Sequence, residues 1–417
     1  MPANAIVTEL LRAIQHEISR SVGEDLTSKE ERALRIGRLA AEMSLSEMLS
    51  ADEEEPTTVV CGCGDTAKSK ERECRAIVTL AGTHKILRRK YHCQVCGAWG
   101  APRDRVLGIG SGNYSAGVVA LTSEIAAGFP FEASEAFLAR RFNLDLCYKQ
   151  VQRLAERTGA IVSSDELNLA RSVAIDDVAV LSKEKPKRLT ISADGLMVNS
   201  DGSWTEMKCA SFISEEHGRS TIATMERAEG FGELLHLEAL RRGAENAEEL
   251  VFVADGAAWI WNLAAHHFPD TVEIVDWYHA TQHLWQVANS WYGDGTHKAK
   301  SWVKNNKARL MEDGADRVVA SIKQWNPTDE DAQRVKRENL HYFTTNANRM
   351  LYGTYRELDY PIGSGSVESA CKQYGEGRLK QAGMRWKKPG IEAIAHLRSA
   401  VLNGRVENIA EVARIAA

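Results

Sequence analysis

The chain has 417 residues, of which 44% are hydrophobic and 26% are charged, and its formal net charge at pH 7 is −5. These fractions are those of an ordinary soluble protein, and the length allows two or three domains with buried cores. No run of residues approaches the roughly 18 apolar residues that a membrane span needs. The composition and patterning therefore exclude a membrane-spanning protein, and we expect no membrane partner.

The N-terminal stretch AIVTELLRAIQHEISRSV has the pattern of an amphipathic helix. Glu9 and Arg12 interrupt its apolar residues, so it is not the hydrophobic region of a secretory signal, and we expect a cytoplasmic protein. The acidic, proline-bearing stretch MLSADEEEPTTVV predicts the end of an N-terminal helical segment at residues 1–55. The apolar positions at helical spacing are Ile6, Leu10, Leu11, Ile14 and Ile18.

Residues 57–106 have the pattern of a zinc-ribbon-like module. Short strands are predicted at residues 76–80 and 86–92, between two cysteine-bearing turns. Thiolates in such turns are ligands for tetrahedral zinc, and the alternative is a set of incidental thiols. The first pair has a gap of one residue, where two are usual, which leaves Cys74 or His92 open as a substitute ligand. The predicted zinc ligands are Cys61, Cys63, Cys93 and Cys96.

Residues 107–165 are predicted to form a helix-turn-helix-like DNA-binding segment. In PFEASEAFLARRFNLDLCYKQVQRLAERTGAIV, a first helix is followed by a short turn around residues 143–145 and by a second helix. An exposed second helix of this kind suits docking in the major groove. An ordinary helical hairpin shows similar spacing and is the alternative interpretation. The exposed residues predicted to contact DNA are Lys149, Gln150 and Arg153.

Two aspartates follow predicted strands in the C-terminal half. Asp194 ends the strand RLTISAD, which can pair with WTEMKCASFISEE through the turn NSDGS, and Asp255 ends LVFVAD. Each is followed by glycine, so each carboxylate is exposed at the edge of a sheet. Two such acids on neighbouring strands can share two Mg²⁺ (or Mn²⁺) ions, because hard cations prefer oxygen ligands. The alternative for each is a simple turn.

Glu368 is the predicted third ligand. It follows the turn YPIGSGS and leads a basic run, so a helix beginning there would direct its carboxylate at the cations. The structural alternative is an ordinary ion pair with Lys372, four residues further on. Residues 66–105 hold ten Lys and Arg against three Asp and Glu, and residues 372–405 hold eight against two. Such basic segments can follow DNA phosphates, and the alternative is two solvated faces.

The chain resembles the transposases of the ISKra group of bacterial insertion sequences, which are relatives of Mutator-type DDE enzymes. The resemblance spans about residues 60–417 and is strongest in GSGSVESAC and RLKQAGMRW. It implies an α/β, ribonuclease H-like mixed sheet flanked by helices in a catalytic domain at residues 170–417. The separation of 113 residues from Asp255 to Glu368 is too long for the bare core, and implies an all-helical insertion at about residues 280–360.

This resemblance also implies the partners and the remaining site residues. The catalytic acids map to Asp194, Asp255 and Glu368, and the DNA partners are the terminal inverted repeats of the element and target DNA. A homo-oligomer is expected on the DNA, because two ends must be joined. Asp276 and His279 match a D-x-x-H element beside the active site, with a helix N-cap as the alternative for Asp276. Further expected contacts are Trp259, which stacks on a base or lies in the core, and the phosphate ligands Lys372, Arg378, Lys380 and Arg385.

Two other functions fit the same residues. One is a ribonuclease H-like nuclease or resolvase that cuts DNA without strand transfer. The other is a zinc-containing DNA-binding regulator whose nuclease-like domain is inactive. The first differs from a transposase in failing to join a 3′-hydroxyl end to target DNA, and the second in failing to nick DNA with Mg²⁺ or Mn²⁺.

Overall fold

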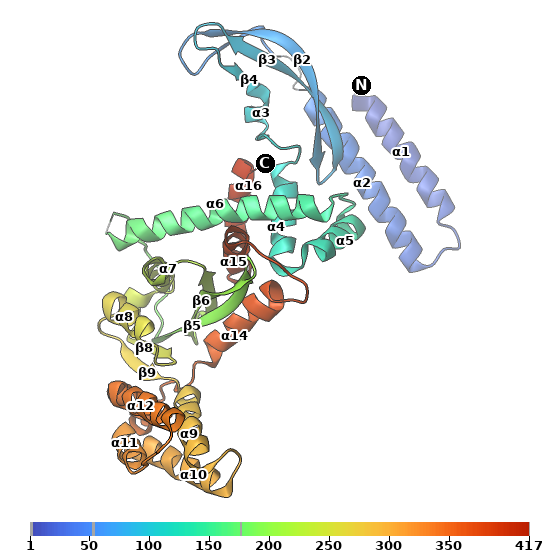
Figure 1. Cartoon of the computed structure of the whole chain (residues 1–417). Helices are drawn as coiled ribbons and strands as arrows, with labels where there is room; N and C mark the ends of the chain where they lie inside the picture. Colours follow the sequence, from blue (N-terminus) through green and yellow to red (C-terminus); the bar gives the residue numbers. More distant parts are fainter. Residues whose placement is uncertain (1–2, 52–54, 176, 417) are drawn as a thin grey trace. The chain divides into compact units, whose positions relative to one another are not determined.

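The computed structural model describes residues 3–51, 55–175 and 177–416 (Figure 1). By its internal contacts the chain divides into unit 1, which comprises Met1–Thr158 and Val406–Ala417, and unit 2, which comprises Gly159–Arg405. The boundary lies inside one long helix. Residues 52–54 of the acidic stretch expected to end the N-terminal segment lie outside the described residues.

Unit 1 begins with an antiparallel helical hairpin, α1 (Ala3–Arg20) and α2 (Leu26–Ala51). Arg32 on α2 bridges Glu17 of α1 and Glu24 of the connecting turn, and so fixes the pairing of the two helices. This confirms the amphipathic helix predicted near the N-terminus and adds a second helix to it.

An antiparallel four-stranded sheet follows, in the order β1 (Thr58–Val60), β2 (Thr66–Thr79), β3 (Gly82–Cys93) and β4 (Trp99–Gly100). The predicted strands at residues 76–80 and 86–92 are parts of the much longer β2–β3 hairpin. Cross-strand ion pairs join the charged part of this hairpin, because Glu73 contacts both Arg88 and Lys90. The alternating exposure of β2 is that of a strand with one covered face.

The rest of unit 1 is helical: α3 (Pro102–Val106), α4 (Ala116–Gly128), α5 (Phe131–Phe142), the first part of α6 (Tyr148–Ala174) and α16 (Val406–Ala416). Helix α5 ends at Asn143, whose left-handed φ of 54° turns the chain toward α6. Leu144 and Leu146 are buried in this connection, which is longer than the turn predicted at residues 143–145. Helix α16 packs on α4 and belongs to unit 1, whereas the sequence placed it in the catalytic segment 170–417.

Unit 2 is built on a mixed five-stranded sheet in the order β7-β6-β5-β8-β9. Strands β5 (Arg188–Ser200), β6 (Ser203–Ser214) and β7 (Gly218–Thr224) are antiparallel, and β8 (Glu249–Ala254) and β9 (Val272–Val275) run parallel to β5. The predicted turn between β5 and β6 is confirmed: Asp201 and Gly202 both have positive φ, as a two-residue hairpin turn requires. Strand β7 was not predicted.

Helices pack against this sheet and extend beyond it. They are α7 (Ala228–Arg241), α8 (Ala258–His267), α14 (Gly365–Tyr374) and α15 (Lys388–Leu402), together with the short helices η1 (Ala244–Asn246) and η3 (Gly375–Leu379). Between β9 and α14 the chain is helical throughout, as predicted for residues 280–360: α9 (Trp277–Tyr292), α10 (His297–Glu312), α11 (Ala315–Lys323), α12 (Glu330–Thr345), η2 (Ala347–Arg349) and α13 (Tyr352–Glu357).

One large hydrophobic core joins the central strands to this helical stretch. Leu189, Phe212 and Phe252 of the sheet are buried in the same cluster as Leu310 and Phe343 of the helices. The protein is thus an α/β protein with a mixed sheet and many helices. None of the described helices is long and apolar enough to cross a membrane.

Candidate functional site

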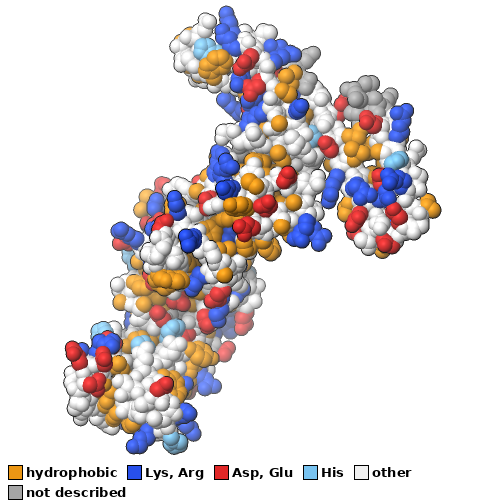
Figure 2. Space-filling model, turned by 45° about the vertical axis from the view of Figure 1, so that its right-hand side comes forward, with side chains coloured by type: hydrophobic (Ala, Val, Ile, Leu, Met, Phe, Trp, Pro, Cys, Tyr) orange, Lys and Arg blue, Asp and Glu red, His pale blue; other side chains and the backbone are white. Residues whose placement is uncertain are grey.

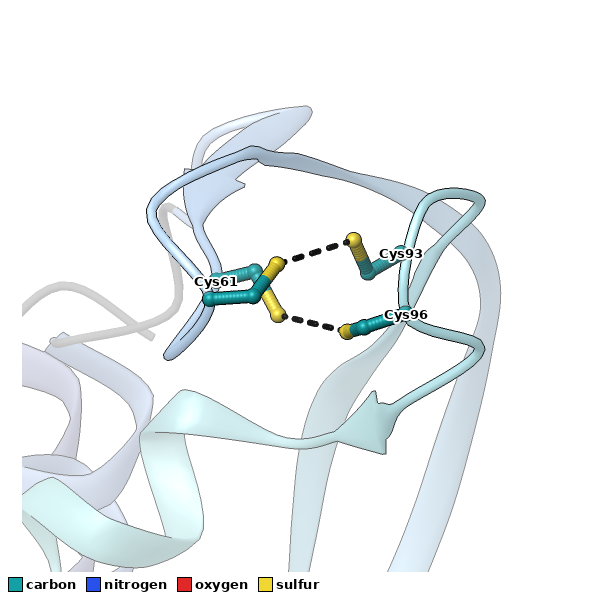
Figure 3. A group of neighbouring side chains, drawn as sticks. Cys61, Cys93 and Cys96 are labelled. Carbon is teal, nitrogen blue, oxygen red and sulfur yellow. Dashed lines mark hydrogen bonds between the residues drawn. The ribbon is translucent and has the colours of Figure 1, made fainter.

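Four cysteine thiols meet at one end of the sheet in unit 1. The Sγ atoms of Cys61 and Cys96 are 3.5 Å apart, those of Cys63 and Cys93 are 3.7 Å apart, and all four lie within 4.8 Å of one another. Figure 3 shows the cysteine side chains of the two turns pointing toward a common centre. In a tetrahedral site with metal–sulfur bonds of about 2.3 Å, neighbouring sulfur atoms are about 3.8 Å apart. The thiol spacing therefore fits one tetrahedral ion.

Matching turns hold the two pairs of thiols. The amide of Gly64 donates to the carbonyl of Cys61 at 2.9 Å, and the amide of Gly97 donates to the carbonyl of Cys93 at the same distance. Both glycines have positive φ, 88° and 73°, which lets the chain fold back under the sulfur atoms. The one-residue gap in the first pair therefore does not prevent it from presenting two thiols.

The substitute ligands that the sequence left open lie outside the four-thiol cluster. Cys74 is paired with Leu87 near the middle of the β2–β3 hairpin, whereas Cys93 is paired with Ala67 at its end. Seven residues of strand separate these positions, which is more than 20 Å at about 3.3 Å per residue. His92 stacks on the ring of Trp99, with centroids 4.7 Å apart.

The charges of these thiols favour a bound cation. Backbone amides of Cys96 and Val95 lower the pKa of Cys93 to about 7. The amide of Ala98 acts in the same direction on Cys96, but the neighbouring thiols outweigh it and raise the pKa of Cys96 to about 12. Four adjacent thiolates repel one another, so a divalent ion would be needed to hold all four deprotonated. Zinc fits a closed set of four cysteines with this spacing.

The predicted acids of unit 2 lie where the parallel pairing of β5 with β8 ends. Asp255 directly follows β8, but Asp194 does not end its strand as predicted, because β5 continues to Ser200 in its pairing with β6. Ser192 on β5 is paired with Val253 on β8, so two residues further on Asp194 is level with Asp255. Ala254 is paired with Val275 on β9, so Asp255 is in turn level with Asp276. Neighbouring strands are about 4.8 Å apart, and the three aspartates thus form a row across three parallel strands.

The electrostatics of this row show that the side chains act on one another. Burial raises the pKa of Asp194, and the negative charge of Asp255 raises it further. The contact with Asp276 raises the pKa of His279, and Asp255 and Asp194 add to this effect. The imidazole of His279 is therefore close to all three carboxylates. An edge with this much negative charge favours a cation.

Asp276 has a structural role in this row. Its side chain is buried and caps α9 by accepting from the amide of His279 at 2.8 Å, and it accepts from the amide and, at 2.7 Å, the hydroxyl of Ser364. Burial acts to raise its pKa, but hydrogen bonds from His279 and Ser364 prevail and lower the pKa to about 2. The N-cap interpretation is confirmed, and the same carboxylate anchors the start of α14.

Helix α14 carries Glu368 and packs against β5, the strand of Asp194, and against its neighbour β6. Ser366 bonds to Ser211 of β6 at 2.8 Å, and the thiol of Cys371 contacts Cys209, the strand partner of Asp194. Glu368 itself is 65% exposed, and its carboxylate lies 2.7 Å from the ammonium group of Lys372. Within the described residues, the four cysteines are the one group of three or more potential ligands close enough to share an ion. The structure therefore brings Asp194 and Asp255 together and leaves the carboxylate of Glu368 in an ion pair.

A second set of residues, which the sequence did not indicate, supports Asp255 from the helical stretch. The hydroxyl of Tyr342 on α12 donates to the carbonyl of Asp255 at 2.9 Å, and its ring stacks on His283 with centroids 3.6 Å apart. His283 in turn contacts Asn339 on α12 at 2.8 Å. The signal available in the sequence was the spacing of two histidines on one helix, which did not reveal a tyrosine from another helix.

The predicted phosphate ligands of unit 2 differ in accessibility. Arg385 is exposed, Lys380 is exposed with its ammonium group 5.7 Å from the ring of Trp204, and Lys372 is paired with Glu368. Arg378 is fully buried, with its guanidinium over the ring of Trp386 at 5.0 Å, so the predicted phosphate contact of Arg378 is wrong for this conformation.

Trp259 is half-buried rather than a free stacking surface. It packs on the core edge-to-face with Phe231, at a centroid distance of 5.8 Å, and the ammonium group of Lys208 lies 5.4 Å from its ring centre. These contacts agree with the core interpretation of Trp259.

In unit 1, Lys149 and Arg153 project from α6 into solvent, and Gln150 is half-exposed. Gln150, Arg153 and Arg157 line a cavity of about 360 Å³ together with the loop Ser111–Tyr114. Two guanidinium groups one helical turn apart make this wall basic. Arg157 was not among the residues that the sequence indicated.

Neither a scan against protein-family models nor a search of curated proteins finds a match to this chain.

Proposed function

We propose that this protein is a DDE transposase of a bacterial insertion sequence, which binds the terminal inverted repeats of its element and catalyses metal-dependent strand cleavage and strand transfer. The observation that carries the proposal is the position of Asp194 on β5, level with Asp255 directly after the adjacent parallel strand β8. Two carboxylates on rigid neighbouring strands are a suitable base for a pair of divalent ions.

The arrangement of unit 2 supports a ribonuclease H-like fold as part of this proposal. Three antiparallel strands are followed by two parallel ones, in the order β7-β6-β5-β8-β9, and helices pack against the sheet. The helical stretch α9–α13 separates the strand of Asp255 from the helix of Glu368, as the resemblance to the ISKra group implies. A protein with this activity would act in the cytoplasm on chromosomal DNA.

In this proposal Asp194, Asp255 and Glu368 hold the metal. Glu368 would reach it by exchanging its ion pair with Lys372 for the cations. Lys372 is then released to contact a DNA phosphate. Metal ions held by these carboxylates would supply an activated nucleophile and neutralise charge on the leaving oxygen. His279, close to both aspartates, is placed to donate a hydrogen bond to a bound phosphate.

The other unit supplies the binding surfaces in this proposal. The four-cysteine module would hold one structural zinc ion and stiffen the end of the β2–β3 hairpin, which carries many of the basic residues of segment 66–105. Lys149, Arg153 and Arg157 on α6 would contact the backbone of an inverted repeat. The expected assembly is a homo-oligomer that joins two element ends.

The test is cleavage of labelled DNA that carries the ends of the insertion sequence. Asp194→Asn, Asp255→Asn and Glu368→Gln are each expected to lower the Mg²⁺-dependent cleavage rate by at least about 1,000-fold and to leave DNA affinity unchanged. Asp201→Asn is the matched control, because it makes the same isosteric change in the turn at the end of β5, where asparagine tolerates the positive φ. Wild-type cleavage by any of the three site variants would refute the assignment.

The ion pair of Glu368 with Lys372 favours a second candidate, a zinc-containing DNA-binding regulator with an inactive nuclease-like domain. Specific DNA binding by the wild type without nicking in Mg²⁺ or Mn²⁺ would identify that function. A nuclease or resolvase would nick DNA but would not join a supplied 3′-hydroxyl end to target DNA. Strand-transfer products from the wild type therefore distinguish the transposase from both alternatives.

A further inference from the structure

The α1–α2 hairpin lacks a core of its own. Every described side chain of residues 7–50 is exposed or half-exposed, and none is buried. Two helices that meet along a single seam bury too little apolar surface to be stable, and helices in proteins owe most of their stability to packing of an apolar face. The C-terminal half of α2 contacts the rest of unit 1, where Ser46 bonds to His84 at 3.0 Å. Near the middle of α2, the guanidinium of Arg38 donates to the carbonyl of Arg141 on α5 at 3.4 Å.

An apolar stripe on α1 faces away from the α1–α2 seam. Val7, Leu11 and Ile18 are 55%, 53% and 60% exposed. At about 100° per residue, these three side chains lie within about 40° of one another around the helix axis. Their mean direction is roughly 90° from that of Glu17, which faces α2. Arg12 lies beyond the stripe, on the far side of the helix. The solvent side next to the stripe carries the uncharged residues Thr8, Gln15 and Ser19.

Helix α2 carries a matching stripe of leucines and small residues. Leu26 and Leu34 are 80% and 55% exposed, and Ala33, Gly37 and Ala41 between and beyond them are exposed too. This stripe is turned from the seam by about 110°, in the same rotational sense as the stripe on α1. When two helices are antiparallel, apolar stripes that are rotated from the seam by similar angles in the same sense lie on the same side of the helix pair. We call these residues, with Val7, Leu11 and Ile18, the hairpin face.

Gly37 gives independent evidence that a backbone approaches this face. It lies in the middle of α2, where glycine is less favourable than alanine. Its φ is that of an ordinary helix, and among the described residues no atom lies within 4 Å of the place a Cβ would occupy. Nothing described in the monomer therefore requires glycine here. A second helix packed closely over Ala33, Gly37 and Ala41 would require it.

From these observations we propose that the hairpin face binds the same face of a second copy of the chain, so that two hairpins form a four-helix bundle. A second hairpin has the same length and the same bare apolar stripe, and a two-fold axis pairs equivalent surfaces. Hydrophobic side chains show on the surface of this hairpin in Figure 2, beside charged ones. Charged residues are depleted at the centre of the face, as in interface cores, and Glu30 lies near its end.

Charge argues against DNA as the occupant. Residues 3–50 hold six Lys and Arg against eight Asp and Glu, so the hairpin is slightly acidic and would not attract phosphates. The same small charge gives little repulsion between two copies. The dimer does not depend on the transposase assignment, because it follows from the hairpin alone.

The test is the oligomeric state of the full-length, DNA-free chain, measured by sedimentation velocity over a range of micromolar concentrations. The wild type is expected to dimerise. Leu11→Glu and Gly37→Glu are each expected to weaken the dimer by at least about 100-fold, because each places a charge in the apolar centre of the interface. Gly37→Glu has open space in the monomer and replaces glycine with a better helix former, so helix content by circular dichroism should not fall.

Arg12→Glu is the matched control. It introduces the same residue next to Leu11 but on the far side of α1, so the dimer should persist. A wild type that remains monomeric over this concentration range would overturn the proposal, as would a dimer that survives both Leu11→Glu and Gly37→Glu. A monomer that instead binds anionic phospholipid vesicles through the hairpin face would identify a lipid surface as the occupant and would equally overturn it.

Discussion

Asp276 shows at the scale of one residue how the candidate active site is assembled. Its carboxylate joins the end of β9 to the first turn of α9 through the amide of His279, and to the start of α14 through Ser364. Helix α14 carries Glu368. By anchoring the first turn of this helix, the carboxylate of Asp276 helps to position the predicted third ligand. The hydrogen bonds from His279 and Ser364 that lower the pKa of Asp276 therefore also hold the elements of the site in place.

The stability supplied by Asp276 should depend on pH. Its pKa is about 2 in the folded chain against 3.8 ordinarily, so its charged form contributes about 2 kcal/mol to the free energy of unfolding. A lowered pKa gives stability that is present above about pH 4 and lost as the pH falls through about 2. Asp276→Asn should therefore lower the free energy of unfolding at pH 7 by about this amount, and the difference from the wild type should shrink below pH 4.

Urea denaturation between pH 2 and 7 measures this effect. Asp270→Asn, an exposed aspartate in the loop before β9, is the matched control and should change the free energy of unfolding little at any pH. A difference between the wild type and Asp276→Asn that stays constant across this range would contradict the ionic role of Asp276.

The cysteine cluster predicts one bound zinc ion per chain. Cys93→Ser removes the buried ligand, so it should abolish stoichiometric zinc and lower the melting temperature, because metal-binding free energy contributes directly to folding. A strong chelator should produce the same shift in the wild type. Cys74→Ser, in the same hairpin but outside the cluster, should keep one zinc ion per chain by atomic emission. Zinc retained in full by Cys93→Ser would exclude this site.

The sequence predicted side-chain positions best where one element determined them. Cys93 and Cys96 share a turn, and Asp255 directly follows β8, so local pattern was enough for these residues. The predicted strand end at Asp194 was wrong, because β5 pairs with β6 as far as Ser200. The orientation of Glu368 could not be predicted, because the choice between Lys372 and a metal ion depends on a rotamer of an exposed side chain. The burial of charged Arg378 was equally out of reach of local pattern, because it depends on packing against Trp386.

At the scale of elements, the helical stretch α9–α13 reaches the candidate active site through α12. Gly256 has a φ of 106°, and a Cβ added there would lie 2.7 Å from the ring of Tyr342. Glycine at this position thus lets a helix from the inserted stretch lie directly over the residue after Asp255. The insertion supports the site in addition to extending the fold.

This contact predicts a coupling between Gly256 and Tyr342. Gly256→Ala should lower the free energy of unfolding by about 2–4 kcal/mol, because it combines positive-φ strain with overpacking. In a Tyr342→Ala background the same change should cost only about 1–2 kcal/mol, since the overpacking is gone and the φ strain remains. Chemical denaturation of the four chains of this double-mutant cycle measures the difference.

Gly295→Ala is the control for strain alone. Gly295 also has a positive φ, 69°, but within the described part of the chain no atom lies within 4 Å of its added Cβ. Its cost should therefore be about 1–2 kcal/mol, the strain of a left-handed φ without overpacking. Equal costs of Gly256→Ala with and without Tyr342 would show that α12 does not bear on the site.

The elements themselves were predicted from periodicity to different degrees. Strands β5, β6, β8 and β9 and the helices between β9 and α14 had clear patterns and turn residues. Strand β7 was missed because its sequence, GRSTIAT, is short and mostly small or polar. In the structure all seven of its residues pair with β6. The place of α16 in unit 1 depends on its packing against α4, nearly 300 residues earlier in the chain, which local pattern cannot give.

At the scale of the whole molecule, an acidic chain of net charge −5 carries its basic residues in restricted segments. DNA binding by such a protein should depend on a few ion pairs with phosphates rather than on overall charge. Removing one cationic side chain that pairs with a phosphate reduces the slope of log affinity against log salt by roughly 1. The proposed DNA-binding residues of α6 and the acids of unit 2 lie in different units, so we expect DNA binding and cleavage to be separable.

The double variant Arg153→Ala with Arg157→Ala tests this separation. Both guanidinium groups line the cavity beside the loop Ser111–Tyr114, so their removal should reduce the salt slope by about 2 and weaken binding similarly for all DNA sequences. Asp194→Asn, which alters the sheet edge alone, should keep the wild-type slope. Both are measured by fluorescence anisotropy without divalent cations, so that no cleavage occurs. An unchanged slope in the double variant would remove this face of α6 from the DNA-binding surface, whereas a reduced slope in Asp194→Asn would mean that the two sites share the same phosphates.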